Sequence, residues 1–471
     1  MGYLQHSATS DSDLSANNWV SLLNLRKQEN YRMNFPRLSS RHLLFTSGAI
    51  LILLACFVIF QIDGSQHGLC TPSWLPPITK SKTESNNGDH LAASWVFVTS
   101  RDADDYGLSH AQCRTAFPKL FVEIEKAVLA RQGKRIDYQE LSSRRLEDAM
   151  VKAMIYDGEL YVLNFESMKY TFTRAKATLS SLNRALTAAS ERENLPNIEF
   201  IFSSEDFTHG PGPIWTYSKR EEDTWAWLMP DFGYWTWPEV NIGSYRQVRR
   251  GMVAIDDGTF IDGEYQAGIE FQDKHKQLFW RGNAATAPEL RQKLLSVTHN
   301  KTWASVVSID WSDGNNTKQN FVPITDHCRY MFLGHVEGRS YSGRGKYLQN
   351  CRSVFVTHKL EWHEAHHAAL VSSGPEANYV ELKRDFSDLE EKITYLIDHP
   401  NIAKQIAENN VEVFRDRYLT PAAEACYWRE LILAYGRISN FEPTLYHIDS
   451  DGKRVRRGVS FESWILDGNL E

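Results

Sequence analysis

The segment LEWHEAHHAAL, residues 360–370, contains His363, Glu364 and His367 in the pattern H-E-x-x-H. On an α-helix this spacing places both imidazoles on one face, where they can bind zinc while the glutamate acts as a general base. A zinc metalloprotease is therefore one hypothesis for the chain. The sequence offers no evident third metal ligand, however, and short motifs of this kind often match by chance. We therefore expect no metal site at this segment.

The residues after the apolar run KQLFW combine positive charge with the start of a helix. Arg281 and Gly282 follow the run directly, and Thr286 and Glu289 form a capping box that is expected to begin a helix carrying Arg291. Guanidinium groups and the free N–H groups of a helix start can together bind a diphosphate. The loop is thus a candidate anion site, although a capped helix with solvated arginines would have the same sequence.

A second loop, within HVEGRSYSGRGKYLQNC, has the same character. Gly338, Gly343 and Gly345 surround Ser342 and Arg344, ahead of the apolar run SVFVT. Glycines allow backbone N–H groups to approach an anion closely, and an arginine can hold it. Two such loops in one half of the chain indicate a phosphate-binding site more strongly than either loop alone.

An acidic residue follows an apolar run in the first half of the chain. The run NIEFIF leads through Ser203 to Asp206. A carboxylate at the end of a strand can serve as a general base, and it can equally begin a turn. Further along, Trp235 and Trp237 belong to a group of tryptophans, and aromatic faces of this kind can hold an acceptor molecule.

The composition excludes one class of partner. The chain has 471 residues, of which 42% are hydrophobic and 24% charged, and its formal net charge is −7. These proportions are typical of a globular protein of two or three domains. The negative charge argues against nucleic-acid binding, which usually requires a basic surface.

Residues 43–62, LLFTSGAILILLACFVIFQI, carry no charged side chain. As a helix they would span about 30 Å, the thickness of the hydrocarbon core of a bilayer. Basic residues precede the segment and Asp63 follows it, so the positive-inside rule predicts a cytosolic N-terminus and a lumenal body. The segment is too long, and begins too far into the chain, for a cleaved signal peptide. We expect a single-pass type II protein of the Golgi or endoplasmic reticulum membrane.

A lumenal body would give meaning to two other features. Asn300 and Asn315 begin N-x-Thr sequences, which are acceptors for N-glycosylation. Five cysteines lie outside the apolar segment, and an oxidising lumen permits two disulfides and one free thiol among them.

Apolar, strand-like runs alternate with helical patterns along the rest of the chain. The runs lie at residues 95–98, 159–163, 198–202, 276–280, 305–309 and 353–357. This alternation predicts an α/β fold with parallel sheets, and two such halves indicate a ligand cleft between two domains. In parallel sheets, ligands bind beyond the carboxyl ends of the strands, where the arginine-containing loops lie. Residues 385–437 are expected to be helical.

Several segments, taken in order, resemble glycosyltransferase family 90, which includes fungal capsule-associated proteins and animal protein O-glucosyltransferases. They are FIFSSEDF, WPEV, FWRGN, APELR, DHCRYMFLGHVEGRSYSGRGKYLQNCRSVFVTH and ACYWRELIL, and the resemblance covers roughly residues 93–440. It implies a GT-B-type fold, in which two Rossmann-like domains face a cleft, with a UDP-sugar donor and inversion at the anomeric carbon. Xylose or glucose is the expected sugar, and a glycan or protein hydroxyl the expected acceptor. No metal or other cofactor is expected to be required.

The resemblance also assigns roles to residues. It implies that Asp206 is the catalytic base, although Glu205 precedes it where the O-glucosyltransferases carry Arg. It implies a disulfide between Cys328 and Cys351, and we also expect Cys113 to pair with Cys426. The residues expected to bind the donor diphosphate are Arg281, Gly282, Arg291, Ser342, Gly343 and Arg344.

The predicted organisation has six parts. They are a cytosolic tail at 1–42, a membrane anchor at 43–62, a stem at 63–92, an acceptor-side α/β domain at 93–245, a donor-binding α/β domain with terminal helices at 246–440, and a C-terminal tail at 441–471.

Two alternatives stand beside the protease. Asp102 and Asp104 follow the first apolar run in the D-x-D pattern with which GT-A-type transferases hold Mg²⁺ or Mn²⁺ against a diphosphate. Carboxylates in such a run are more often simply solvated. The last alternative is a non-catalytic glycan-binding protein, which would bind a glycan without releasing UDP.

Overall fold

The computed structural model describes residues 95–166, 171–240 and 242–467. The expected cytosolic tail, membrane anchor and stem lie outside these residues. No helix within the described ranges is long and apolar enough to cross a bilayer.

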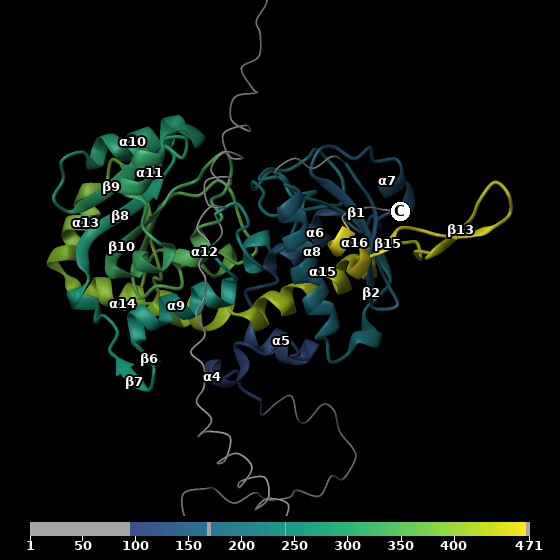
Figure 1. Ribbon diagram of the computed structural model, residues 1–471, viewed down its shortest axis with the longest axis horizontal. Coiled ribbons are helices and arrows are strands. Elements are labelled where there is room, and N and C mark those ends of the chain that lie inside the picture. Colours follow the sequence, from purple (N-terminus) through teal and green to yellow (C-terminus); the bar gives the residue numbers. More distant parts are fainter. Residues whose placement is uncertain (1–94, 167–170, 241, 468–471) are drawn as a thin grey trace, which may run out of the picture. The chain divides into compact units, whose positions relative to one another are not determined.

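Five strands from the first half of the described chain and β15 from near its end form a mixed sheet with the order β15-β2-β1-β3-β4-β5. Its strands are β1 (Met150–Tyr156), β2 (Glu159–Phe165), β3 (Ile198–Ser203), β4 (Ile214–Thr216), β5 (Trp227–Leu228) and β15 (Val459–Ser460). Of these strands, β1, β2 and β15 are labelled together in Figure 1. The pairs β3–β4 and β4–β5 are parallel, whereas β1 runs antiparallel to both β2 and β3.

The expectation of a parallel sheet is therefore wrong for this half. The strands β1 and β2 form a hairpin that turns at Asp157 and Gly158, both with positive φ. An Asp-Gly pair between two apolar runs is a hairpin signal, because both residues tolerate the left-handed backbone that a type I′ turn requires. The alternation of apolar runs with helical patterns in the sequence does not indicate that β1 and β2 are antiparallel.

Helices pack around the mixed sheet. They are α4 (Thr99–Asp102), α5 (His110–Ala116), α6 (Val122–Ala130), α7 (Tyr138–Ser142), α8 (Phe172–Thr187) and α16 (Phe461–Asp467). The strand expected at residues 95–98 is absent from the described structure, because this stretch has no β partner and leads directly into α4.

The second half builds a fully parallel sheet with the order β12-β11-β10-β8-β9. Its strands are β8 (His275–Gly282), β9 (Ala304–Ser308), β10 (Tyr330–His335), β11 (Val354–His358) and β12 (Val380–Leu382). Numbered from β8, this is the order 2-1-3-4-5, one of the two common orders of doubly wound α/β sheets. The order reverses between β8 and β10, and ligands of such sheets bind at the carboxyl ends of the strands at this switch point.

The helices of the second half include α10, which begins at Pro288 as expected. They are α9 (Tyr245–Asp257), α10 (Pro288–Thr298), α11 (Gly314–Asn320), α12 (Gly345–Leu348), α13 (Leu389–Asp398) and α14 (Pro400–Asn410). The predicted capping box is wrong: the N-cap of α10 is Ala287, and no side chain caps the helix. Proline at the first position has no N–H to satisfy, and Thr286 instead belongs to a 3-10 turn whose N-cap is Asn283.

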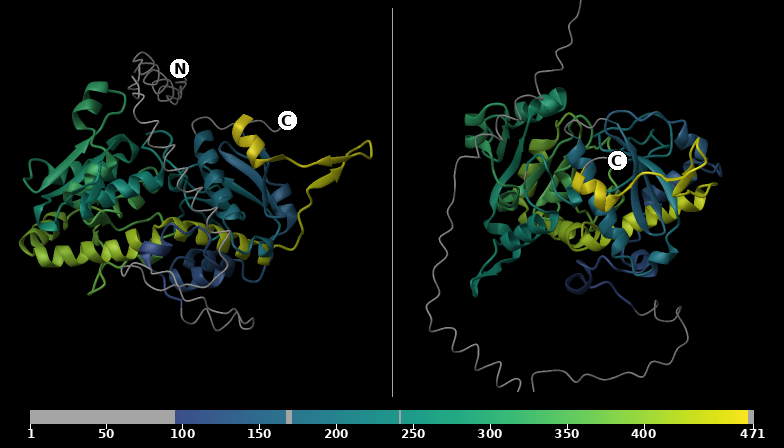
Figure 2. Two further views of the ribbon diagram at one scale, coloured as in Figure 1. Left: turned by 60° about the horizontal axis from the view of Figure 1, so that its bottom comes forward. Right: turned by 45° about the vertical axis from the view of Figure 1, so that its right-hand side comes forward.

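The chain finally returns from the second sheet to the first. A π-helical segment, Val411–Tyr418, follows α14, and α15 (Pro421–Ile438) then packs against α5, α6 and α8 (Figure 2). Beyond it lies a hairpin of β13 (Tyr446–Ile448) with β14 (Arg454–Arg456). The strand β15 then joins the edge of the first sheet beside β2, so part of the segment expected as a C-terminal tail is built into the fold. Another hairpin, β6 (Thr259–Ile261) with β7 (Glu264–Gln266), lies earlier in the chain, after α9.

Two disulfides fasten this arrangement. Cys328 and Cys351 have Cα atoms 5.0 Å apart, and those of Cys113 and Cys426 are 5.5 Å apart. Both expected bridges are therefore present, and each Cα separation lies within the ordinary range. The second bridge joins α5 to α15.

Candidate active site

Arg291 is buried beside the loop that follows β10. Only 7% of the residue is exposed, and its guanidinium donates to the backbone carbonyls of Asn283 (2.7 Å), Glu337 (3.0 Å) and Val336 (3.3 Å). Burial lowers the pKa of Arg291 to about 10. The surrounding backbone fixes the direction of the side chain, and no carboxylate of the described residues pairs with it.

Arg344 lies next to Arg291. Its Nη1 donates to the carbonyl of Arg281, whereas its Nε is buried without a hydrogen-bond partner. The two guanidinium carbons lie 5.7 Å (Arg291) and 5.9 Å (Arg344) from the ring centroid of Trp280. Burial, and then the neighbouring charge of Arg291, lower the pKa of Arg344 to about 9. Two buried cations sharing one indole, with no carboxylate between them, form a site that favours an anion.

The other residues expected at the donor site lie near Arg291 and Arg344 in the chain, but the Arg281 side chain is held by different partners. Arg281 donates to the carbonyls of Ser305 (2.6 Å) and Asn320 (3.1 Å) and lies over Phe279, so its guanidinium is held at the β9 side of the sheet. Gly282 ends β8, and Ser342 and Gly343 immediately precede Arg344. These positions bring the ends of β8 and β10 together at the switch point.

Gly338 lets the β10 loop pass close to Arg291. A Cβ atom built on Gly338 would lie 3.2 Å from Arg291 Nη2 and 3.3 Å from Thr286 Cγ2, closer than most Cβ contacts. A side chain at residue 338 would therefore press on the guanidinium. The glycine-rich composition of this loop thus serves a close approach to the arginine.

Asp206 lies just beyond the carboxyl end of β3, an interior strand of the first sheet. Its Oδ1 accepts a hydrogen bond from Arg174 Nη1 at 2.7 Å, and 31% of the carboxylate side chain is exposed. The backbone carbonyl of Asp206 accepts from Ser218 Oγ at 3.0 Å and from Ser340 Oγ at 2.5 Å. Since Ser340 belongs to the loop after β10, the candidate base is attached directly to the loop that carries Arg344.

A buried ion pair joins the glycine-rich loop after β10 to the segment that follows β5. Lys346 Nζ lies 2.7 Å from Asp231 Oδ2 and also donates to the carbonyl of Gly343 at 2.8 Å. Tyr347 donates its hydroxyl proton to the carbonyl of Gly233 at 2.8 Å. The glycine-rich loop is thereby anchored to residues 231–233, which follow β5 of the first sheet.

The two acceptor-side tryptophans differ in environment. Trp235 is 38% exposed, with the Arg184 guanidinium 4.9 Å from its ring centroid. Trp237 is partly buried and stacks on Tyr347 with a centroid distance of 6.1 Å. Trp235 therefore offers an accessible aromatic face, whereas Trp237 contributes to packing around the loop anchor.

The H-E-x-x-H segment does not form an α-helix, so it lacks the geometry in which this motif binds zinc. His363 forms a β-bridge with Lys219, and the chain then enters a short 3-10 turn, His367–Ala369. The rings of His363 and His367 have centroids 6.5 Å apart. The backbone of His363 is committed to the bridge, which prevents the helical repeat on which the motif depends.

A different set of side chains gathers nearby. Ligand atoms of Glu364, His366 and His367 all lie within 4.8 Å of one another. The amide N–H of Glu364 donates to His367 Nδ1 at 3.1 Å, which places the proton of the neutral ring on Nε2, 3.3 Å from Glu364 Oε2. His366 Nε2 lies 3.0 Å from Gln349 Oε1. A zinc-binding histidine presents an unprotonated nitrogen to the metal, and in His367 that nitrogen, Nδ1, already accepts the Glu364 amide.

The D-x-D carboxylates are occupied by arginines. Asp102 is buried, accepts from the amide of Val98 at 2.7 Å and pairs with Arg101 at 2.6 Å. Asp104 pairs with Arg246 at 2.9 Å. A pair of carboxylates neutralised in this way does not resemble a prepared site for a divalent cation.

Sequence reasoning missed three groups at the site. Arg174 pairs with Asp206, and Glu239 pairs with Arg174 from a separate segment. Tyr341 has a buried hydroxyl with no hydrogen-bond partner among the described residues. Burial and the nearby charges of Asp231, Asp206 and Glu364 raise the pKa of Tyr341 well above its usual value. The only sequence signal was the position of Glu239 within WPEV and of Tyr341 within the glycine-rich loop.

Together, the fold and this site define a class: an α/β protein with two buried arginines at the switch point of a parallel sheet and a partly exposed aspartate, Asp206, whose backbone is bonded to the loop after β10. Residues 112–451 match the model of glycosyl transferase family 90. The chain belongs to glycosyltransferase family 90.

Curated relatives carry related names. The chain is 26% identical over 275 residues to an O-glucosyltransferase rumi homolog of Aedes aegypti, which covers 53% of this chain and 63% of the relative. It is 24% identical over 273 residues to protein O-glucosyltransferase 1 of Homo sapiens, covering 53% of this chain and 65% of the relative. The match thus spans a little under two thirds of these relatives.

Proposed function

We propose that this protein is an inverting glycosyltransferase that moves a sugar from a UDP-sugar to a hydroxyl of a protein or glycan. The observation that carries the proposal is the buried pair Arg291 and Arg344, without a carboxylate partner in the described chain, at the switch point of the parallel sheet. A diphosphate supplies the negative charge that this pair requires. The names of the relatives support glucose, and the sequence motifs support xylose or glucose.

Asp206 is the proposed catalytic base. Inverting transfer requires a group that takes the proton of the acceptor hydroxyl while this oxygen attacks from the side opposite UDP. The Asp206 carboxylate is partly exposed, and its backbone is bonded to the arginine-bearing loop through Ser340. The two arginines stabilise the departing diphosphate, whose negative charge grows as the glycosidic bond breaks. In the proposed GT-B arrangement, the first sheet supplies the base and the parallel sheet the donor site.

The activity test is UDP release by the full-length chain in detergent with UDP-glucose and UDP-xylose as donors. We expect turnover with at least one donor, and Asp206→Asn should reduce it by about 10²–10⁴-fold. UDP affinity, measured by titration calorimetry, should stay within about twofold because the carboxylate does not contact the diphosphate in this proposal. Glu205→Gln removes the adjacent carboxylate and is the matched control. Normal turnover of Asp206→Asn would overturn the assignment of the base.

We also propose that the chain is a type II membrane protein with a lumenal body. The uncharged segment 43–62 and its basic flank support this orientation. Asn300 and Asn315 are both exposed, as glycosylation acceptors must be, and the two disulfides fit an oxidising compartment. Protease treatment of sealed vesicles should leave the body intact, and digestion of the body would show that the orientation is wrong.

A further inference from the structure

Arg174 contacts two carboxylates from different parts of the chain. It lies in the first turn of α8, with Nη1 2.7 Å from Asp206 Oδ1 and Nε 2.5 Å from Glu239 Oε1. Its guanidinium carbon lies 4.6 Å from the ring centroid of Phe232. The guanidinium is therefore fixed by an aromatic face and by two ion pairs.

The charge of Arg174 is secured by these neighbours. Burial lowers the pKa of Arg174, but the charges of Asp206 and Glu239 outweigh this effect and raise the pKa above the usual arginine value. The side chain is only 12% exposed, so water screens the contact weakly. Arg174 thus remains a cation throughout the range in which an enzyme works.

The contact affects the two oxygens of Asp206 differently. Arg174 binds Oδ1, and no hydrogen bond to Oδ2 occurs within the described residues. Fixing Oδ1 selects one orientation of the carboxylate and leaves Oδ2 for the acceptor hydroxyl. An arginine that pairs with a single carboxylate stabilises the charged form of that carboxylate and so weakens it as a base. Glu239 shares the same guanidinium and offsets part of this effect.

We propose that Arg174 is the positioning residue for the base Asp206, and that Glu239 balances the charge of Arg174. This inference rests on the proposed function, since it assumes that Asp206 takes the proton of the acceptor. Arg174 itself need not touch either substrate. Its removal should slow the chemical step through disorder of the carboxylate and leave the diphosphate site unchanged.

The variants Arg174→Gln and Arg174→Lys test this role. We expect the kcat of Arg174→Gln to fall by about 10²-fold, the size of effect that a misplaced catalytic group produces. The KM for the UDP-sugar and the affinity for UDP should change by less than about twofold. Arg174→Lys keeps the charge but cannot reach both carboxylates in the same fork, so its kcat should lie between those of Arg174→Gln and the wild type. Glu239→Gln should also lower kcat, with no change in UDP affinity.

Arg184 provides a matched control on the same helix. Its Nη2 lies 2.7 Å from Glu424 Oε2, so it makes a comparable ion pair that does not involve Asp206. Arg184→Gln should cause a loss of thermal stability similar to that of Arg174→Gln, but kcat should stay close to wild type in the folded protein. Equal losses of kcat in the two variants would reduce Arg174 to a structural role and overturn the proposal.

A double variant separates this proposal from the one on which it rests. If Arg174 acts through Asp206, the double variant Arg174→Gln/Asp206→Asn should be no slower than Asp206→Asn alone. A much slower double variant would overturn the positioning role while Asp206 remained the base. Near-normal turnover of Asp206→Asn would instead remove the base assignment itself. Should Arg174→Gln fail to fold, Arg174→Lys and Glu239→Gln provide the same comparison.

Discussion

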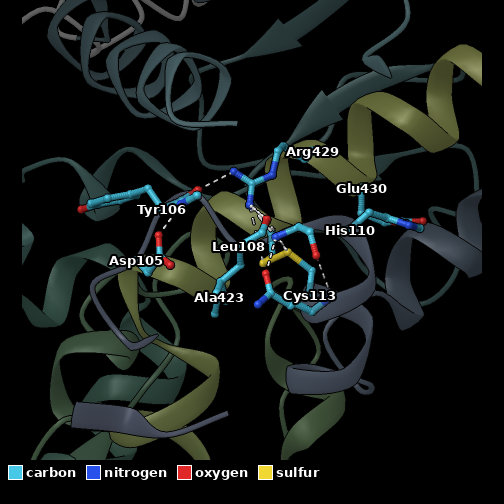
Figure 3. The surroundings of a disulfide bond; sticks show 12 residues. Asp105, Tyr106, Leu108, His110, Cys113, Ala423, Arg429 and Glu430 are labelled. Atoms are coloured by element: carbon cyan, nitrogen blue, oxygen red, sulfur yellow. Dashed lines mark hydrogen bonds and ion pairs between the residues drawn. A yellow bond between two sulfur atoms is a disulfide. The ribbon is translucent and has the colours of Figure 1, made fainter. Parts of the chain in front are cut away.

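Arg291 and Arg429 are equally buried arginines with opposite surroundings. Each is 7% exposed, and burial lowers the pKa of each to about 10. Arg429 Nη1 donates to the carbonyls of Tyr106 and Ala185, and its Nη2 faces Leu108 O and both sulfurs of the Cys113–Cys426 bridge (Figure 3). Both of its terminal nitrogens are fully used by the protein.

Arg291 likewise bonds to three carbonyls, but its neighbour Arg344 is not saturated in this way. Arg291 makes three hydrogen bonds to backbone carbonyls, and Arg344 makes one, although a guanidinium has five N–H groups. Asp105 and Glu191 support the charge of Arg429, whereas the charged neighbour that shifts the pKa of Arg344 is another arginine. Burial alone therefore does not mark a binding site. The sign of the neighbouring charges separates the two arginines, and Arg344 adds a buried donor left over after folding.

The largest expected effect is on stability, at Arg429. Arg429→Ala removes the donors to three buried carbonyls, and each unsatisfied buried group costs about 1–3 kcal/mol. We expect the free energy of unfolding to fall by about 3 kcal/mol or more in denaturant titrations. UDP affinity of the remaining folded protein should be unchanged. A stable Arg429→Ala protein that has lost UDP binding would contradict the structural role of Arg429.

The next effect is on binding, at Arg344. Arg344→Ala removes a charge-assisted contact to the diphosphate worth about 1.5–3 kcal/mol, which corresponds to roughly a 10- to 150-fold weaker Kd for UDP. The unliganded protein should lose little stability, because the substitution also removes a buried charge. Differential scanning calorimetry should show a rise in Tm with saturating UDP for the wild type and a much smaller rise for the variant. Equal UDP-induced rises would exclude Arg344 from the donor site.

The smallest effect is expected at the histidine segment. His363 and His367 contact Lys219 and Glu364, not the arginine pair, so replacing both by Gln should leave kcat within about threefold of wild type. Chelation of metal ions should not change the activity. An inactive double variant that has also lost stoichiometric zinc would restore the metalloprotease hypothesis.

The residues of the proposed donor site could be selected from the sequence because they are local to strand ends. The loop after β8 was recognisable from an apolar run followed by a glycine and arginines, and the loop after β10 from its glycines and arginine ahead of the run SVFVT; the strand-end rule then predicts that they lie close together. The β10 strand itself, and the switch of strand order that makes the rule decisive, follow only from the pairing in the structure.

The acceptor side could be predicted only in part. Asp206 was visible at the end of β3, but its partner Arg174, and Glu239 that shares this arginine, are 32 and 33 positions away from Asp206 in the chain, on segments without a shared motif. Their contact depends on how α8 packs on a mixed sheet whose hairpin was not expected. The H-E-x-x-H motif failed for the same reason, because a bridge from Lys219 determines the backbone at His363.

The Cys113–Cys426 bridge has a consequence for the synthesis of the protein. Its two cysteines are separated by 313 positions, and α15, which carries the second cysteine, packs on three helices of the first half. At a translation rate of roughly 5–20 residues per second, about 15–60 seconds pass between the appearance of the two cysteines. During this interval the apolar surfaces of α5, α6 and α8 that α15 covers in the folded protein are expected to stay exposed. The nascent first half is therefore expected to depend on chaperones and on protection of the Cys113 thiol until the last long helix emerges.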